Sequence, residues 1–173
     1  TNEAFGQTVS DLRSLMHWLR EEERSGPIGM MGISLGGYTT ALMANLEPSL
    51  SFAIPIVAPA SFADLVWHHG EKNSNRHRTE AKGMNLSIFR ELWSVHCPLE
   101  QNPVVPKDRR FIVWGEGDRV VLPEHQAALW EHWDRPKVMA FPGGHILQLG
   151  WHQYTRAIHR WIGDIWDGQT LVD

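Results

Sequence analysis

Three residues of this chain have side chains that can act together in nucleophilic catalysis: Ser34, Asp118 and His145. A neutral serine hydroxyl is a poor nucleophile, but a histidine can take its proton during attack and return it to the leaving group. A buried carboxylate holds the imidazole in the required tautomer and stabilises its cation. Each of the three follows a predicted strand, so they would meet at the carboxyl edge of a parallel sheet. We therefore expect an acyl-transfer site at that edge.

The serine lies at the centre of a Gly-x-Ser-x-Gly pattern that it forms with Gly32 and Gly36. The apolar run at 28–33 and the apolar-periodic stretch that begins at Leu35 predict a strand, a sharp turn and a helix. Side chains in place of the two glycines would collide with the neighbouring strand and helix. The backbone N–H of Leu35, at the helix start, would be placed to bind an oxyanion. The alternative is a glycine-rich turn in which Ser34 only caps the helix.

The elements that must position these groups alternate along the chain. Apolar runs predict four strands, at 28–33, 52–57, 111–114 and 137–141. Periodicity predicts helices at 2–24, 35–47, 61–69, 86–96, 123–133 and 146–166. Residues 70–85 are polar and have no period, which predicts a mobile surface loop, and 98–110 should be an extended connection. Alternating strands and helices favour an α/β fold with three αβα layers and a mostly parallel sheet of about four strands. We expect a single domain over 1–173, with residues 61–106 as a lid-like insert.

Three motifs resemble those of the α/β-hydrolase superfamily. Gly-Ile-Ser-Leu-Gly-Gly at 32–37 matches its nucleophile elbow, Trp-Gly-Glu-Gly-Asp at 114–118 resembles the segment that carries its acid, and Phe-Pro-Gly-Gly-His at 141–145 resembles the segment that carries its histidine. The chain order of serine, aspartate and histidine is also that of the superfamily. The resemblance covers nearly all of this chain but only the C-terminal half of the fold, because four strands normally precede the elbow strand and here one helix does.

The resemblance implies a role for each residue of the motifs. Ser34 would be the nucleophile, Asp118 the orienting acid and His145 the base, with the N–H of Leu35 as one oxyanion donor. It implies a serine esterase that cleaves a small-molecule carboxylic ester through an acyl-enzyme and needs no cofactor. The loop that usually gives the second oxyanion donor follows the third strand of the family fold, which this chain lacks. Losing one such donor typically costs on the order of a hundred- to a thousandfold in turnover.

The missing strands also leave the elbow strand at 28–33 as an edge with unpaired N–H and C=O groups. This strand is too apolar to stay in water, so we predict a homodimer in which two elbow strands pair about a twofold axis. A different function follows from the same features. The chain would then be a non-catalytic remnant, or the C-terminal fragment of a longer hydrolase, that serves as a dimeric interaction module. The first residue, Thr1, is not methionine, which leaves an upstream segment open.

Rival assignments exist for the acid and for the substrate pocket. Asp64 follows the second strand, where some α/β-hydrolases place their acid. It is also the fourth residue of a capping box begun by Ser61, and we therefore favour Asp118. Trp67 and Trp93 lie in the insert, where they would either line an apolar acyl or aryl pocket or fill the core of the insert itself.

Composition and charge argue against several kinds of binding partner. The 173 residues are 42% apolar and 21% charged with a net charge of −4 and no basic block, so we expect no nucleic acid. No apolar run approaches the length of a membrane span, and no signal peptide stands at the start. His125 and His132 lie seven residues apart, too far along one helix to share an ion, so we expect no metal site. The single Cys97 excludes an internal disulfide and favours a reducing, cytoplasmic location.

Overall fold

The structure, a computed structural model, describes residues 2–70 and 74–170 and is built on one parallel sheet. Its strands are β1 (Met30–Ile33), β2 (Ala53–Ile56), β3 (Phe111–Gly115) and β4 (Lys137–Phe141). They pair in the order β1-β2-β3-β4, and every pair is parallel. The predicted α/β fold with about four parallel strands is confirmed. No helix in the described ranges has both the length and the apolar character needed to cross a membrane.

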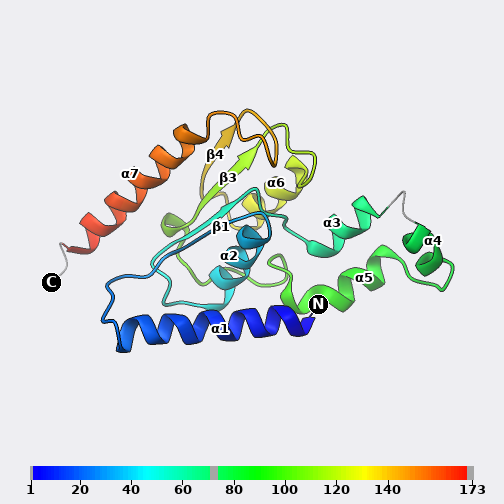
Figure 1. Cartoon of the computed structure of the whole chain (residues 1–173), viewed down its shortest axis with the longest axis horizontal. Helices are drawn as coiled ribbons and strands as arrows, with labels where there is room; N and C mark the ends of the chain where they lie inside the picture. The colour runs from blue at the N-terminus through cyan, green and yellow to red at the C-terminus, as the bar shows by residue number, and fades with distance from the viewer. Residues whose placement is uncertain (1, 71–73, 171–173) are drawn as a thin grey trace.

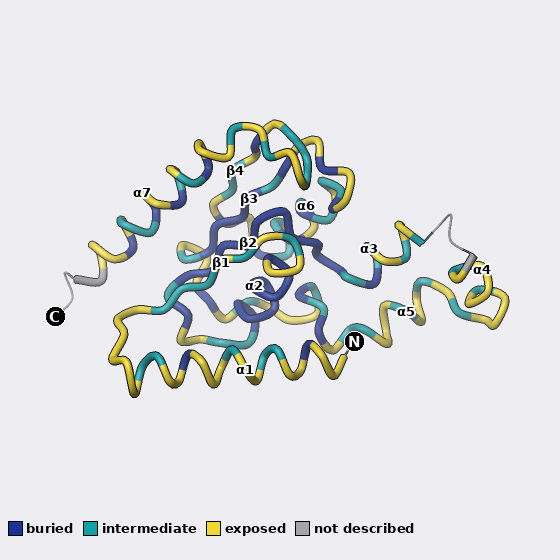
Figure 2. Tube along the Cα trace, in the orientation of Figure 1, coloured by how far each residue is buried: buried dark blue, intermediate teal, exposed yellow. Residues whose placement is uncertain are grey.

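Helices cover both faces of the sheet and make three layers. One face carries α1 (Asn2–Glu21), α2 (Leu35–Leu46) and α6 (Pro123–His132), and the other carries α7 (Trp151–Thr170) (Figure 1). The buried residues follow these two interfaces (Figure 2). Met43 and Leu129 belong to the cluster on the first face, whereas Ile54 and Trp161 belong to the cluster under α7. Helix α6 begins at Pro123, as expected for a residue with a fixed φ and no N–H.

Strand β1 forms one edge of the sheet and is covered on one face only. Its register pairs Met31 with Ile54 and Ile33 with Ile56, so these side chains point to the face that α7 covers. The core under α7 is built on β2, β3 and β4, and Met31 and Ile33 remain 56% and 52% exposed. Within the described part of the chain, β1 has a strand neighbour only on the β2 side. The apolar edge strand expected from the sequence is therefore present, and the structure adds that one of its faces is uncovered.

The segment after β2 forms what we call the arm, residues 61–96. It contains α3 (Phe62–His69), α4 (Ser74–Glu80), α5 (Leu86–Trp93) and the 3-10 turn η1 (Ser94–His96). Figure 1 shows its helices extending outward from the body of the molecule. A second 3-10 turn, η2 (Lys107–Arg109), leads into β3.

Several element boundaries differ from the sequence prediction. The predicted loop at 70–85 contains α4, while residues 71–73 lie outside the described residues. One local and one tertiary contact stabilise this helix: Arg76 pairs with Glu80 one turn later, and its guanidinium lies over the ring of Trp67 in α3. The first and fourth predicted helices are shorter than expected, since α1 ends at Glu21 and α5 ends at Trp93, where a 3-10 turn follows.

The last predicted helix begins five residues late, at Trp151. Residues 146–150 form a turn, in which the N–H of Gly144 donates to the carbonyl of Leu147 at 3.0 Å. Gly150 has a φ of 75°, which prevents the helix from extending backward through it. The apolar side chains that suggested a helix here are exposed instead, and Ile146 is 90% exposed.

Candidate active site

The structure brings the serine, the histidine and the aspartate into one hydrogen-bonded chain. Ser34 follows β1, Asp118 follows β3 and His145 follows β4. The His145 Nε2 atom lies 2.7 Å from the Ser34 Oγ atom, and His145 Nδ1 lies 2.8 Å from Asp118 Oδ2. The Asp118 side chain is completely buried, whereas that of His145 is 13% exposed. A carboxylate can only accept, so Nδ1 carries the hydrogen in this bond, and in the neutral ring Nε2 is then free to accept the serine proton.

Ser34 occupies a strained turn between β1 and α2. Its φ of 57° and ψ of −116° lie outside the favoured regions for a residue with a side chain, at a typical cost of about 1–3 kcal/mol. Its N–H donates to Ile56 at 2.9 Å, and its carbonyl accepts from Tyr38 at 2.9 Å, so backbone bonds hold the turn from both sides. The side chain makes no capping bond to α2. The alternative that Ser34 is only a helix cap is therefore wrong.

The glycines of the elbow have unequal roles. A Cβ atom on Gly32 would lie 2.2 Å from the carbonyl oxygen of Gly36. The end of β1 and the start of α2 can therefore lie this close together only because residue 32 has no side chain. A Cβ atom on Gly36 would meet nothing within 4 Å. The expectation that Gly36 avoids a collision is wrong, because its α-carbon faces solvent at the outer side of the helix start. The second close approach occurs at Gly37, where a Cβ would lie 2.9 Å from the carbonyl oxygen of Ile56.

Asp118 is fixed by the backbone that follows it, in what we call the acid loop, residues 116–122. Its Oδ1 atom accepts the N–H of Val120 at 2.8 Å and the N–H of Val121 at 2.9 Å. These two bonds set the plane of the carboxylate and leave Oδ2 for His145. The signal in the sequence is Asp118 itself, because an aspartate in a loop often accepts the backbone N–H groups two and three residues further on.

Backbone contacts between glycines join the acid loop to the loop that carries His145. The N–H of Gly117 donates to the carbonyl of Gly143 at 2.8 Å. A Cβ on Gly117 would lie 3.1 Å from that same oxygen, and a Cβ on Gly144 would lie 3.1 Å from the carbonyl oxygen of Gly117. Gly143 has a φ of 123°, which a residue with a side chain rarely adopts. The glycines of both motifs therefore let the acid and the base come within hydrogen-bond distance.

The rival acid, Asp64, serves the arm. Its N–H donates to Ser61 Oγ at 3.2 Å, which confirms the predicted cap, and its carboxylate accepts from Arg90 Nε at 3.1 Å. Burial raises the pKa of Asp64, but the hydrogen bonds from Arg90 and Ser61 outweigh it and hold that pKa below its usual range. The structure gives His145 a different carboxylate partner, Asp118.

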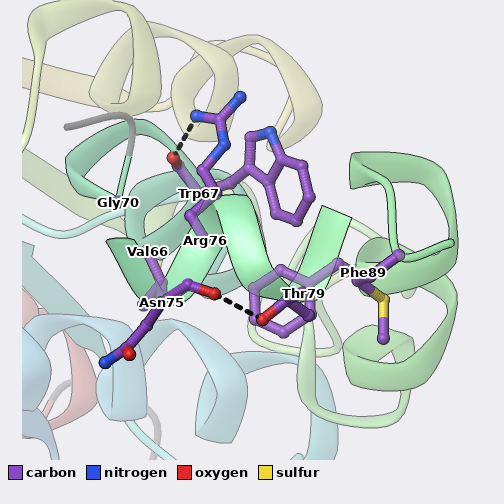
Figure 3. A pocket seen from close by; sticks show the side chains of 8 residues that line it. Val66, Trp67, Gly70, Asn75, Arg76, Thr79 and Phe89 are labelled. Atoms are coloured by element: carbon purple, nitrogen blue, oxygen red, sulfur yellow. Dashed lines mark hydrogen bonds between the residues drawn. The ribbon is translucent and has the colours of Figure 1, made fainter. Parts of the chain in front are cut away.

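The two tryptophans of the arm pack within the arm. The guanidinium carbon of Arg76 lies over the Trp67 ring, 4.5 Å from its centroid, and Arg76 Nη1 donates to the Trp67 carbonyl at 2.8 Å (Figure 3). Trp67 also lines an apolar cavity of about 230 Å³. The Trp93 ring stacks on that of Phe62, with ring centroids 5.5 Å apart, and its centroid lies 4.4 Å from that of the Phe89 ring. Both rings thus contribute to the core of the arm, and the residues lining the Trp67 cavity include none of the three site residues.

Leu35 is the first residue of α2, so its backbone N–H has no carbonyl partner within the helix. This N–H belongs to the residue directly after Ser34, at the positive end of the helix dipole. An oxygen atom bound next to the Ser34 hydroxyl would be within reach of this donor.

Comparisons with known proteins show the family of this chain. Residues 1–90 match the family model of the X-Pro dipeptidyl-peptidase (S15 family). Two uncharacterized proteins of Mycobacterium tuberculosis are each 35% identical over 171 residues, which covers 96% of this chain and 39% of theirs. The chain thus spans well under half the length of the curated relatives that it matches.

Solved structures share the fold at low identity. An esterase of Pyrococcus furiosus is 15% identical with a TM-score of 0.63, over 90% of this chain and 61% of that protein. The Est1E protein of Butyrivibrio proteoclasticus is 18% identical with a TM-score of 0.64, over 93% of this chain and 70% of that protein. An acylaminoacyl peptidase of Pyrococcus horikoshii is 16% identical with a TM-score of 0.62, over 87% of this chain and 25% of that protein.

Proposed function

Because the chain belongs to the X-Pro dipeptidyl-peptidase (S15) family of the α/β-hydrolase superfamily, we propose that it is a serine hydrolase that cleaves carboxylic esters. The observation that carries the proposal is the hydrogen-bonded chain from Ser34 through His145 to Asp118. The strained turn at Ser34 supports it, since a backbone is held in such a conformation only where the surrounding structure requires it.

The reaction follows from the positions of these atoms. The Ser34 oxygen attacks the ester carbonyl carbon while His145 Nε2 takes the hydroxyl proton. The resulting imidazolium is stabilised by Asp118, and the negative carbonyl oxygen accepts the N–H of Leu35. Collapse of this intermediate breaks the bond to the alcohol, which leaves with the proton from His145. A water molecule then attacks the acyl-enzyme by the same steps, and it releases the acid and restores the Ser34 hydroxyl. None of these steps calls for a cofactor.

Peptide-bond hydrolysis is the second candidate, and the family match favours it. The same acyl-enzyme forms, but the leaving group is an amine that must receive its proton from His145. Two chromogenic substrates distinguish the candidates: a short-chain p-nitrophenyl ester and an aminoacyl-prolyl p-nitroanilide. Turnover of the ester alone favours the first proposal. A larger kcat/KM for the anilide favours the second.

The test of a working nucleophile is covalent labelling by a fluorophosphonate probe. We expect the wild-type chain to be labelled and Ser34→Ala and His145→Ala not to be. Ser14→Ala is the matched control, because its hydroxyl lies on the exposed side of α1 and donates to the Ser10 carbonyl of the preceding turn. A folded wild-type protein that is not labelled would refute the enzyme proposal. It would favour instead a non-catalytic remnant that acts as a dimeric interaction module.

A further inference from the structure

One residue of the acid loop links the arm to the triad. The Nε2 atom of His69, the last residue of α3, lies 2.7 Å from the carbonyl oxygen of Val120. The N–H of the same Val120 donates to Asp118 Oδ1 at 2.8 Å. We propose that His69 is a positioning residue for the triad acid, acting through Val120. The expected effect on the reaction of Ser34 rests on the proposed function, whereas the expected effect on the order of the acid loop does not.

The acid loop is anchored at its two ends by other residues. At the start, Gly117 donates its N–H to Gly143, and at the end Gln126 Nε2 donates to the carbonyl of Val121 at 2.9 Å. Between these anchors the loop is largely exposed, and Val120 is 40% exposed. The His69 contact therefore falls on an exposed residue of the loop, next to the N–H groups that hold Asp118.

The chemistry of the contact defines the donor. A carbonyl oxygen only accepts, so His69 Nε2 must carry the hydrogen. The adjacent ring, His68, lies edge-on to His69 with ring centroids 5.3 Å apart. An amide side chain of similar reach, as in His69→Gln, keeps a donor at the end of the side chain, whereas His69→Ala removes it. The pair of variants therefore separates loss of the hydrogen bond from loss of the ring.

The expected effect is modest and local. Without His69, the Val120 carbonyl can bond to water, so the fold is retained and only the order of the loop is reduced. We expect a three- to tenfold slower reaction with the fluorophosphonate probe in His69→Ala, which is the range for one net hydrogen bond. We also expect amide hydrogen exchange at Val120 and Val121 to accelerate by a similar factor, because their N–H groups are held by Asp118.

The experiment compares the wild type with His69→Ala, His69→Gln and the control His159→Ala, which changes an exposed histidine of α7. Faster exchange and slower labelling in His69→Ala alone, largely restored by His69→Gln, support the inference. Unchanged exchange in His69→Ala refutes it. Slower labelling in His69→Ala that comes with a lower Tm and is not restored by His69→Gln also refutes the inference, because His69 would then only hold the arm in place. If no variant is labelled, the proposed function fails, but hydrogen exchange still tests the His69 contact.

Discussion

Gly32→Ala is the sharpest test of the elbow geometry. The added methyl would lie 2.2 Å from the Gly36 carbonyl oxygen and 2.3 Å from the Gly36 carbonyl carbon. These are backbone atoms at the start of α2, which cannot move away as the end of a flexible side chain can. Inserting a methyl into a well-packed region costs about 1–3 kcal/mol, and we place this change near 3 kcal/mol. For a domain of this size that loss lowers Tm by about 6–12 °C.

The matched control is Gly36→Ala, at the other glycine of the same pattern. A methyl there meets nothing within 4 Å, and Gly36 does not have a positive φ. We expect its stability to be unchanged or raised by at most about 1 kcal/mol, because alanine restricts the unfolded chain. Thermal unfolding followed by circular dichroism measures both variants, and the rate of fluorophosphonate labelling reports on Ser34. A shift of the nucleophile by 1 Å can cost about a hundredfold in rate.

Two outcomes would refute this reasoning. Gly32→Ala could unfold within about 2 °C of the wild type, which would mean that β1 and α2 separate at little cost. Alternatively, Gly36→Ala could be as damaging as Gly32→Ala, which would mean that the region outside the start of α2 is filled in the working protein.

Three further predictions follow from the site, the buried histidine and the edge strand. Asp118→Asn should lower ester turnover on the order of 10⁴-fold, while Asp64→Asn should retain most of the activity, as measured with a p-nitrophenyl ester. Burial lowers the pKa of His96, so below about pH 6.5 the unfolded chain takes up a proton that the folded protein resists. Stability should therefore fall as pH drops from 7.5 to 5, and His96→Gln should reduce this dependence in thermal unfolding. We also propose the symmetric dimer through β1, so light scattering at micromolar concentration should give twice the 19.8 kDa mass. The double change Met31→Lys and Ile33→Lys should give a monomer, and a monomeric wild type would contradict the proposal.

The sheet and the approximate location of the site could be predicted from the sequence because their signals are local. Each strand is a short apolar run, and each of Ser34, Asp118 and His145 lies in the segment that follows one. In a parallel sheet the loops after the strands gather at one edge, so order along the chain is enough to predict proximity. The bonds that orient the site were only partly predictable. An aspartate often accepts the backbone N–H groups that follow it, but the turn after β3 decides that Val120 and Val121 supply them.

The errors have physical causes outside the local sequence. The residues of α4 show no apolar period, and the helix depends on Arg76 lying over Trp67 in a different element. The apolar side chains of Ile146 and Leu147 extended the predicted helix, but they are 90% and 70% exposed in a turn before α7. Apolar periodicity predicts a buried face, and it misleads where apolar side chains remain on the surface.

The hydrogen bonds that hold Ser34, His145 and Asp118 together all lie within this chain. The elbow is held by the bond from Ser34 to Ile56, and the two loops of the acid and base are joined through Gly117 and Gly143. None of these contacts involves the uncovered edge of β1. The second oxyanion donor of the superfamily, by contrast, belongs to a part of the fold that precedes the elbow strand. We therefore propose that activation of Ser34 and stabilisation of the oxyanion are separable in this chain. We expect the chain to react with a phosphonate, whose leaving group is already activated, more readily than it turns over an unactivated ester.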